Sequence, residues 1–547
     1  MSSGISYAQG ACAVPLLGET IGENLRRTVE RARDREALVV RHQDYRATYG
    51  ELWEQTGRAA RGLLALGIRK GDRVGIWAPN RYEWVVVQYA TARIGAILVN
   101  VNPAYKAVEL AHALRQSGTR VLLLARSFRT TDYVALVREI RVGCPDLTES
   151  LVLEDGWEAL LGNGDGVTEA TLAEREASLQ FDDPINIQYT SGTTGLPKGA
   201  TLSHHNVLNN GYFIGEALRY SEQDRVCIPV PFYHCFGMVL GNLACTTHGA
   251  CMVVPAESFD PVATLETVQA ERCTSLYGVP TMFVAELDHP RFGEFDLSTL
   301  RTGIMAGSPC PIEVMKKVNA LMHMAEVTIC YGMTETSPVS TQSATDDAVE
   351  RRVSTVGRVH PHVEIKIVDP GGGSVVPRGT PGELCTRGYS VMLGYWNDPA
   401  ATQAAIDEAR WMHTGDLATL DGEGYVKIVG RIKDMIIRGG ENVYPREVEE
   451  FLYTHPDVAD VQVIGVPSPL YGEEVMAWVK PKDGGHPTGE QLAEFCRGKI
   501  ATYKIPRHWK FTDSFPMTVT GKVQKFRMRE ISVEELGLQA AAREQTA

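Results

Sequence analysis

The chain has 547 residues, a formal net charge of −13 and 44% hydrophobic residues. This length exceeds what one hydrophobic core usually organises, so at least two domains are expected. The acidic balance argues against a nucleic-acid binder or a protein that docks on anionic membranes.

From about residue 73 the sequence alternates short apolar runs with longer helix-like segments. Such alternation predicts mostly parallel sheets covered by helices. The turn-rich stretch GNGDG, at 162–166, predicts a surface loop between them. Helices are expected at 82–93 and 107–116. Strands are expected at 73–78, 97–101, 120–125, 185–189, 226–230, 250–254, 275–279, 303–306 and 327–331.

After about residue 355, short alternating runs at 364–368 and 383–386, separated by Pro/Gly turns, predict a β-rich subdomain. Beyond GRIKDMIIRGG (430–440) the sequence predicts a separate α+β unit. Its helices are expected at 446–453 and 489–499, and its strands at 458–465 and 475–480. The predicted fold is therefore α/β, with a large domain over 1–431 and a small mobile α+β domain over 432–547.

Residues 189–199, YTSGTTGLPKG, form a hydroxyl-rich loop after an expected strand. The loop approaches the G-x-x-x-x-G-K-[ST] phosphate pattern but fails it twice. Pro197 has no N–H to donate, and Gly199 has no hydroxyl for a metal. An ordinary solvated loop has the same composition, so this stretch alone leaves both interpretations open. The groups that suit phosphate are the hydroxyls of Thr190, Ser191, Thr193 and Thr194 and the ammonium of Lys198.

Four further blocks follow in order: YGMTETSP (331–338), HTGD (413–416), GRIKDMIIRGGENVYPREVE (430–449) and TVTGKVQK (518–525). Together with the loop they resemble the AMP-forming adenylating superfamily, which includes acyl-CoA synthetases, peptide-synthetase adenylation domains and beetle luciferases. The resemblance covers nearly the whole chain. VNPAYKAVEL (101–110) and PFYHCFGMVLG (231–241) further resemble medium-chain enzymes of the acyl-CoA synthetase family member 2 group.

The resemblance implies a two-step reaction with ATP, Mg²⁺ and CoA. A carboxylate first attacks the α-phosphorus of ATP, which gives an acyl-adenylate and pyrophosphate. A thiol then attacks the acyl carbon and releases AMP. Lysine is suited to bridging two anions, and Lys522 is expected to contact both the α-phosphate and the attacking carboxylate.

Nucleotide contacts are implied for several blocks. Thr334 is expected on the phosphates and Glu335 on magnesium, for which an oxygen ligand is suitable. Asp416 is expected on the ribose hydroxyls, and Arg431 on the ribose or a phosphate. The remaining ATP-binding residues implied by the resemblance are Thr190, Ser191, Gly192, Thr193, Thr194, Gly195 and Lys198 for the phosphates, Gly307, Ser308, Pro309 and Tyr331 around the adenine, and Gly332 and Met333 directly after Tyr331.

The small domain is expected to rotate about a hinge at Lys433, because one arrangement cannot present both Lys522 and a thiol tunnel. Gly439, Gly440 and Glu441 are then expected to approach the pantetheine of CoA.

The acyl pocket is expected around PFYHCFGMVLG, where His234 maps to a gating residue. Residues 232–241 contain no Asp or Glu. A substrate ammonium would need such a partner when buried, so an acid without an α-amino group is expected. The candidate lining residues are Phe236, Gly237, Met238, Val239, Tyr277, Val279, Met305 and Val339.

Three alternatives remain at this point: an enzyme that loads a separate carrier protein, a luciferase-like oxygenase, and a nucleotide-binding scaffold without chemistry. The eleven cysteines have no Cys-x-x-Cys spacing, which gives no indication of a zinc or dithiol motif. Scattered cysteines suit a reducing cytosol. The amino terminus lacks the features of a signal peptide, and residues 84–101 are too short and polar to span a bilayer. A homo-oligomer remains open.

Overall fold

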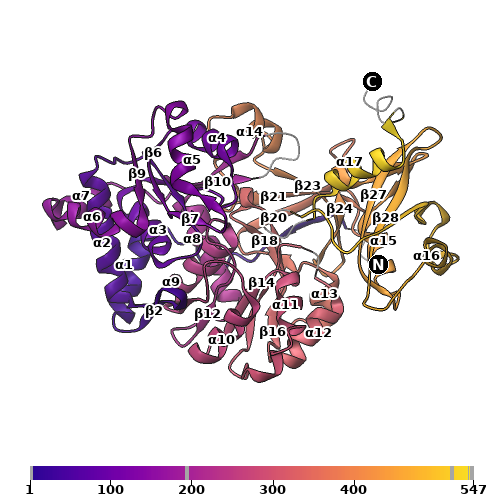
Figure 1. The fold of residues 1–547 in the computed structure, drawn as a ribbon, viewed down its shortest axis with the longest axis horizontal. Helices are drawn as coiled ribbons and strands as arrows, with labels where there is room; N and C mark the ends of the chain where they lie inside the picture. Colours follow the sequence, from indigo (N-terminus) through magenta and orange to yellow (C-terminus); the bar gives the residue numbers. More distant parts are fainter. Residues whose placement is uncertain (1–3, 191–195, 309, 518–522, 540, 542–547) are drawn as a thin grey trace.

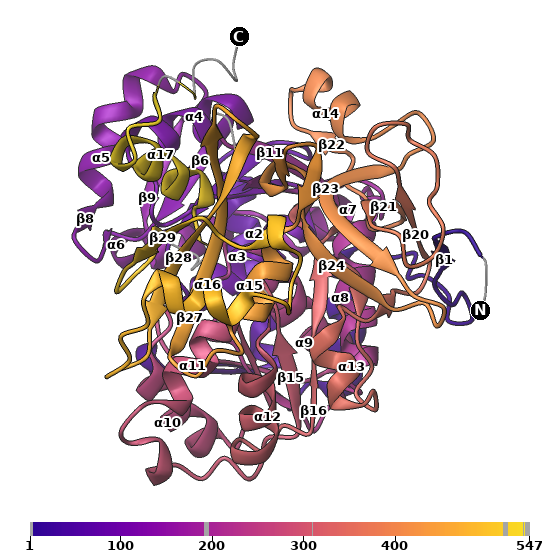
Figure 2. The ribbon, with the colours of Figure 1, turned by 90° about the vertical axis from the view of Figure 1, so that its right-hand side faces the viewer.

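The computed structural model describes residues 4–190, 196–308, 310–517, 523–539 and 541. Two large sheets with their helices form one end of the molecule in Figure 1, and the C-terminal unit forms the other end. A β-rich region lies between them. Figure 2 views the molecule from the side of the C-terminal unit.

The first seven-stranded sheet carries the hydroxyl-rich loop. Its strands, in spatial order, are β22 (Gly394–Tyr395), β11 (Lys198–Ser203), β10 (Pro184–Thr190), β5 (Ile97–Asn100), β4 (Arg73–Trp77), β6 (Thr119–Leu124) and β9 (Glu149–Val152). Strands β10, β5, β4, β6 and β9 are parallel, whereas β11 runs antiparallel to both of its neighbours. All of β5 is buried, as expected for a strand covered on both faces.

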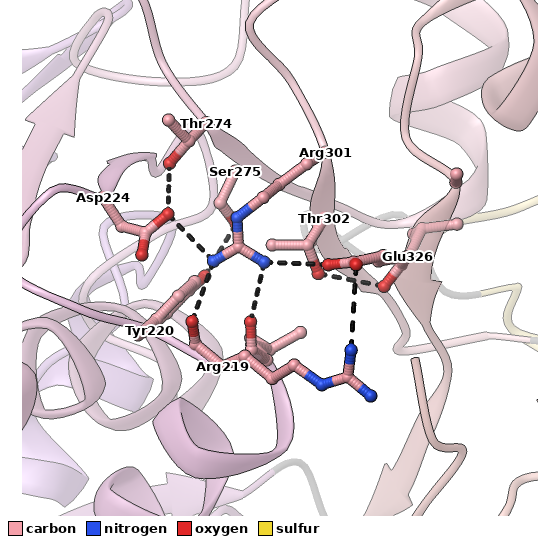
Figure 3. Close-up of polar contacts among 12 residues, drawn as sticks. Arg219, Tyr220, Asp224, Thr274, Ser275, Arg301, Thr302 and Glu326 are labelled. Atoms are coloured by element: carbon pink, nitrogen blue, oxygen red, sulfur yellow. Dashed lines mark hydrogen bonds and ion pairs between the residues drawn. The ribbon is translucent and has the colours of Figure 1, made fainter. Parts of the chain in front are cut away.

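The second seven-stranded sheet is parallel except at one edge, where β3 pairs antiparallel with β2. Its strands, in order, are β16 (Glu326–Thr328), β15 (Thr302–Met305), β14 (Ser275–Gly278), β12 (Arg225–Cys227), β13 (Cys251–Val254), β2 (Glu36–Val40) and β3 (Tyr45–Thr48). Figure 3 shows the Arg301 guanidinium at the amino edge of this sheet, between Asp224 and Glu326, at 2.9 Å from an oxygen of each.

Two smaller sheets form the β-rich region. The five-stranded sheet consists of β1 (Tyr7–Gln9), β20 (Val363–Val368), β21 (Gly382–Gly388), β23 (Met412–Leu420) and β24 (Val426–Arg431). The three-stranded sheet consists of β17 (Cys330–Gly332), β18 (Val339–Gln342) and β19 (Arg358–Val359). All pairs in both sheets are antiparallel, so these sheets need no helical crossovers.

The C-terminal unit has its own sheet and core. Its strands are β26 (Glu441–Val443), β25 (Ile436–Arg438), β28 (Gly472–Pro481), β27 (Val458–Ser468) and β29 (His508–Phe511). Strand β24 ends at Arg431 in the preceding sheet, so the chain passes from one sheet to the other between 431 and 436. The division into 1–431 and 432–547 therefore remains our proposal for the domains.

Helices cover both large sheets. Helix α3 (Tyr82–Ile94) is buried along nearly its whole length and contacts strands of both sheets. Its polar residues have partners: Gln88 donates to the Met238 carbonyl at 3.2 Å, and Arg93 pairs with Glu176 at 2.5 Å. The other helices are α1 (Ile21–Ala32), α2 (Tyr49–Ala65), α4 (Ala107–Ser117), α5 (Tyr133–Ile140), α6 (Leu153–Asn163), α7 (Glu169–Ala177), α8 (His204–Ala217), α9 (Ala244–His248), α10 (Pro261–Glu271), α11 (Pro280–Leu287), α12 (Ile312–Leu321), α13 (Val349–Ser354), α14 (Pro399–Ala405), α15 (Pro445–Leu452), α16 (Gly489–Cys496) and α17 (Lys525–Glu535).

The predicted fold class is confirmed, including the parallel sheets, the β-rich region and the separate C-terminal α+β unit. The stretch 162–166 is exposed at four of its five positions, as predicted, but it is helical rather than an irregular loop. Helix α6 continues to Asn163, and a 3₁₀ turn covers Gly164–Gly166. Gly164 is buried against α2, where an added Cβ would lie 2.8 Å from the Gly62 nitrogen. Here glycine permits close packing of the backbone.

Candidate active site

The hydroxyl-rich loop leaves the sheet at Thr190 and returns at Lys198, two residues that are paired in the β10–β11 ladder. The Pro197 carbonyl accepts a hydrogen bond from His112 Nε2 at 2.9 Å. The Lys198 side chain is exposed and its ammonium lies 5.2 Å from the Tyr395 ring centroid. Ser191, Gly192, Thr193, Thr194 and Gly195 lie outside the described residues.

Glu335 lies beside the base of this loop, in the 3₁₀ turn η6 (Thr334–Thr336). Its side chain is buried, and Oε1 accepts hydrogen bonds from Tyr395 Oη at 2.8 Å and Thr190 Oγ1 at 3.3 Å. Burial, followed by the charge of Glu335, raises the pKa of the Tyr395 hydroxyl well above its usual range. Tyr395 therefore stays protonated as a donor at neutral pH. Both hydrogen bonds from described residues go to Oε1, which leaves Oε2 as an oxygen ligand suited to a hard cation.

A second cluster joins three predicted nucleotide residues. Tyr331 Oη donates to Asp416 Oδ2 at 2.6 Å, and Arg431 Nε donates to Asp416 Oδ1 at 3.2 Å. Asp416 and Arg431 are neighbours across the β23–β24 ladder, and Tyr331 arrives from β17. Burial, with Asp416 next, raises the pKa of Tyr331 well above its usual range. This cluster combines a carboxylate, a guanidinium and an aromatic ring, which are groups that suit a ribose and a base.

Two glycines among the predicted nucleotide residues occupy backbone positions that leave little room for a side chain. Gly332 passes so close to the facing strand that an added Cβ would lie 1.7 Å from the Pro338 carbonyl oxygen. Gly307 follows β15 with φ +92°, a conformation that favours glycine, and an added Cβ would approach Val279. Ser308 is exposed after it. Pro309 lies outside the described residues. Met333 is the N-cap residue of η6 and directly precedes it.

The expected acyl wall begins at His234, whose carbonyl accepts from the Met238 amide at 3.0 Å. Residues Phe236–Leu243 then form a π-helix, a widened helix that is frequent at functional sites. Within it Gly237, Met238 and Val239 are buried, and the Phe236 ring lies 5.7 Å from that of Tyr277. Tyr277 and Val339 share the same large core.

Met305 does not join that wall, which corrects the prediction. Its neighbour Ile304 packs in the core that contains Tyr277, whereas Met305 packs in a different core with Leu276 and Phe283. Successive strand residues point to opposite faces of a sheet. The apolar run 303–306 gave no indication of which face each side chain would take.

The glycines expected at the thiol form a tight turn. Gly439 and Gly440 join β25 to β26, with φ values of +59° and +87°, and Arg438 pairs across the turn with Glu441. Two successive positive φ angles are the requirement of a type I′ hairpin. Lys433 lies in a short 3₁₀ turn after β24. Lys522 lies outside the described residues.

Residues that the sequence analysis did not select also contribute. Tyr395, in GYW, gave no motif signal, since an isolated tyrosine is usually a packing residue. Glu383 Oε2 lies 2.8 Å from His413 Nδ1, and Glu383 Oε1 accepts from the Gly415 amide at 3.1 Å. This brace holds the backbone directly before Asp416. The spacing of residues in the sequence could not indicate this contact, because Glu383 and His413 come from different strands.

Within the described chain, Glu383, His413 and Cys385 are the group whose ligand atoms are near enough for a metal, within 4.8 Å of one another. The Cys385 thiol is buried, and burial raises its pKa to about 12. The Glu383–His413 hydrogen bond accounts for the contact of these two side chains without an ion.

A surface cavity of about 550 Å³ lies away from this site. It opens at the amino edge of the second sheet, near Arg225 and Thr274, whereas Tyr277 and Gly307 lie towards the carboxyl edge. Its walls carry the paired side chains of Arg225 and Glu271, which are 2.8 Å apart. We assign this cavity no role in the chemistry.

Comparison with known proteins places these clusters in context. Residues 25–396 match the model of the AMP-binding enzyme family, and residues 447–522 match that of the AMP-binding enzyme C-terminal domain. The chain is 51% identical to YngI of Bacillus subtilis (strain 168), named as an acyl-CoA synthetase, over 96% of this chain and 99% of that protein. It is 43% identical to the human mitochondrial medium-chain acyl-CoA ligase ACSF2, over 98% of this chain and 91% of the relative.

Among solved structures, ATP-bound MatB from Rhodopseudomonas palustris superposes with a TM-score of 0.81 at 30% identity. That match covers 93% of this chain and 99% of MatB. The anthranilate CoA ligase AuaEII in complex with anthranoyl-AMP superposes with a TM-score of 0.82 at 26% identity, over 95% of this chain and 98% of that one.

Proposed function

Because this chain belongs to the AMP-binding enzyme family, we propose that it is an ATP-dependent, AMP-forming ligase that joins a medium- to long-chain apolar carboxylic acid to CoA. The observation that carries the proposal is the convergence of residues distant in sequence. Thr190 meets Glu335, and Tyr331 and Arg431 each meet Asp416. These contacts join four of the five motif blocks.

The phosphates of ATP are assigned to the loop between Thr190 and Lys198, with Thr334 beside it. The loop offers hydroxyls and a cation, which stabilise developing negative charge. Mg²⁺ is assigned to Glu335 and would neutralise phosphate charge when bound. The fit rests on the Glu335 carboxylate, whose Oε2 receives no hydrogen bond from the described residues.

The ribose is assigned to Asp416 and the adenine to Tyr331, with Gly307 and Ser308 beside the base. Arg431 keeps the Asp416 carboxylate oriented. Lys522 is assigned to the α-phosphate and the substrate carboxylate. In the first step a carboxylate oxygen bonds to the α-phosphorus while the bond to pyrophosphate breaks. In the second step the CoA thiol releases its proton to water and its sulfur bonds to the acyl carbon, while the bond between the acyl carbon and the phosphate oxygen breaks and AMP leaves with that electron pair.

The second step is assigned to a rotated small domain, with Lys433 as the hinge and Gly439, Gly440 and Glu441 near the pantetheine. The tight Gly439–Gly440 turn supports this assignment, because its lack of side chains allows a thin substrate arm to pass close to the backbone.

The substrate class is supported by the acyl wall. Phe236, Met238, Val239 and Tyr277 are apolar or have their polar atom engaged, since Tyr277 Oη donates to the Leu240 carbonyl at 2.9 Å. The names of the ACSF2 relatives point to the same class of acid. An apolar pocket distinguishes neighbouring chain lengths by only about 1–3 kcal/mol per methylene.

The test is AMP release with CoA and a panel of octanoate, decanoate, dodecanoate, palmitate and an amino acid. The fatty acids should support turnover and the amino acid should not. Met238→Ala should enlarge the acyl pocket by shortening one side chain of its wall, so the preferred acid should become longer. Met305→Ala is the matched control, because it removes an equally buried methionine from the other core and should leave the optimum unchanged. An optimum that moves equally in both variants would contradict the assignment.

A carrier-loading enzyme would make the acyl-adenylate but transfer the acyl group to a phosphopantetheine carrier rather than to CoA. A luciferase-like oxygenase would consume oxygen after adenylation. Acyl-CoA formed in stoichiometric proportion to AMP, without oxygen uptake, separates our proposal from both.

We place the protein in the cytoplasm, and the support is its eleven unpaired cysteines, ten of them buried. No helix in the described part of the chain is long and apolar enough to cross a membrane. The oligomeric state remains open.

A further inference from the structure

We propose that Tyr395 is a positioning residue that holds the Glu335 carboxylate for Mg²⁺ and couples it to the phosphate loop. This inference rests on the proposed function and names a residue that acts through Glu335. It concerns a side chain outside the motif blocks, in the short strand β22.

The position of Tyr395 is fixed by its backbone. Strand β22 pairs with β11, so Tyr395 lies opposite Ala200, two residues after Lys198. The Tyr395 amide also donates to Thr402 Oγ1 at 2.9 Å, which ties it to helix α14. The chain segment that carries Glu335 is tied to the same region, because the Met392 amide donates to the Glu335 carbonyl at 2.9 Å. Donor and acceptor therefore sit on segments that are joined through the backbone.

The side chain of Tyr395 contacts two groups assigned to ATP. Its hydroxyl donates to Glu335 Oε1 at 2.8 Å, and its ring lies 5.2 Å from the Lys198 ammonium. A cation over an aromatic ring is attracted to the ring face. One tyrosine thus restrains the carboxylate expected at the metal and the lysine expected at the phosphates.

The consequence for metal binding follows from the geometry of the carboxylate. Hydrogen bonds from Tyr395 and Thr190 engage Oε1, and Oε2, which accepts none from the described residues, remains available to a ligand. Removing such an outer partner typically weakens metal affinity by roughly 10- to 100-fold, because the ligand must then be ordered on binding. Tyr395→Phe removes the hydroxyl and keeps the ring over Lys198.

The experiment measures the affinity for α,β-methylene-ATP by calorimetry, once with Mg²⁺ and once with EDTA. The readout is the metal-dependent gain in affinity, which requires no turnover. For Tyr395→Phe we expect this gain to fall about 10-fold while the affinity in EDTA stays unchanged. The matched control is Tyr7→Phe, which removes a similar hydrogen bond, Tyr7 Oη to Glu364 Oε1 at 2.7 Å, in the five-stranded sheet. The gain should be unchanged in that variant.

A double variant tests whether Tyr395 acts through Glu335. Glu335→Gln should reduce the metal-dependent gain by itself, and adding Tyr395→Phe should reduce it little further, because the two residues act on one ligand. Equal weakening by Tyr395→Phe in Mg²⁺ and in EDTA would overturn the inference, as would additive losses. If the unaltered chain bound no nucleotide, the proposed function itself would fall. Unchanged metal dependence in both Tyr395→Phe and Glu335→Gln would reject the metal assignment while leaving nucleotide binding intact.

Discussion

Replacing Asp416 with alanine should remove the ribose contact and weaken ATP use by about 100-fold. The carboxylate already accepts from Tyr331 and Arg431, so its orientation is set before ATP binds. A hydrogen bond to a charged group contributes about 1.5–3 kcal/mol. A loss near 3 kcal/mol corresponds to roughly 100-fold, because about 1.4 kcal/mol equals one factor of ten.

The assay is acid-dependent ATP–pyrophosphate exchange with ATP, 2′-deoxy-ATP and 3′-deoxy-ATP. The unaltered enzyme should prefer ATP by at least about 10-fold, the worth of one hydrogen bond to a charged group. Asp416→Ala should use all three nucleotides almost equally, because the acceptor of the ribose hydroxyls is gone.

The matched control is Asp421→Ala, at the other end of the same hairpin, where the carboxylate pairs with Arg351 at 2.8 Å. That variant should keep the preference for ATP. An Asp416→Ala enzyme that still prefers ATP over both deoxynucleotides would refute the ribose assignment, even if its overall activity fell.

Three further predictions concern the lysine assigned to the α-phosphate, the glycine turn assigned to CoA and a buried histidine. Lys522→Ala should depress acyl-adenylate formation by roughly 100- to 1000-fold, because a positive charge at the transition state is lost. Thioester formation from supplied acyl-adenylate should be spared. Equal losses in both half-reactions would count against the role of Lys522. Gly440→Leu should depress acyl transfer to CoA more than ATP–pyrophosphate exchange, because the φ of +87° disfavours a side chain and leucine would obstruct the approach of the thiol. If the exchange rate fell as far as the transfer rate, the assignment of Gly440 to the CoA side would be rejected. Burial lowers the pKa of His204 to about 3. Because unfolding restores an ordinary pKa near 6.5, the unfolded chain binds the proton first, and the contribution of His204 to stability should fall by about 1.4 kcal/mol per pH unit as pH drops below 6.5. Burial also lowers the pKa of His360, to about 4, so the unaltered chain should lose more than this. Between pH 7 and pH 5.5, urea unfolding of His204→Asn should show a loss smaller by about 1 kcal/mol than that of the unaltered chain, and equal losses would contradict the assignment.

The large parallel core was predictable from the sequence because its strands are nearly continuous apolar runs. The prediction 73–78 corresponds to β4, and 97–101 to β5. Other boundaries depended on tertiary contacts. The run 327–331 splits into β16 and β17, which belong to different sheets, so one apolar segment serves two layers.

The candidate site was likewise predictable from the sequence only in part. The motif blocks pointed to Glu335, Asp416 and Arg431, and these lie in two hydrogen-bonded clusters. Motifs could not identify Tyr395, because its importance comes only from the approach of β22 to η6. The sequence also could not predict which face of the sheet Met305 occupies. A fully apolar strand has no alternation of polar and apolar residues to indicate which side chains face the acyl wall.

Labelling the oxygen atoms of the substrate carboxylate and following them through one turnover shows whether the reaction passes through an acyl-adenylate. The enzyme is given ATP, CoA and decanoate carrying ¹⁸O in its carboxylate, and the AMP and acyl-CoA are analysed by mass spectrometry. If the carboxylate attacks the α-phosphorus, each AMP should carry one ¹⁸O atom, and each acyl-CoA should keep the other. Unlabelled AMP, or ADP with labelled phosphate, would contradict the acyl-adenylate route.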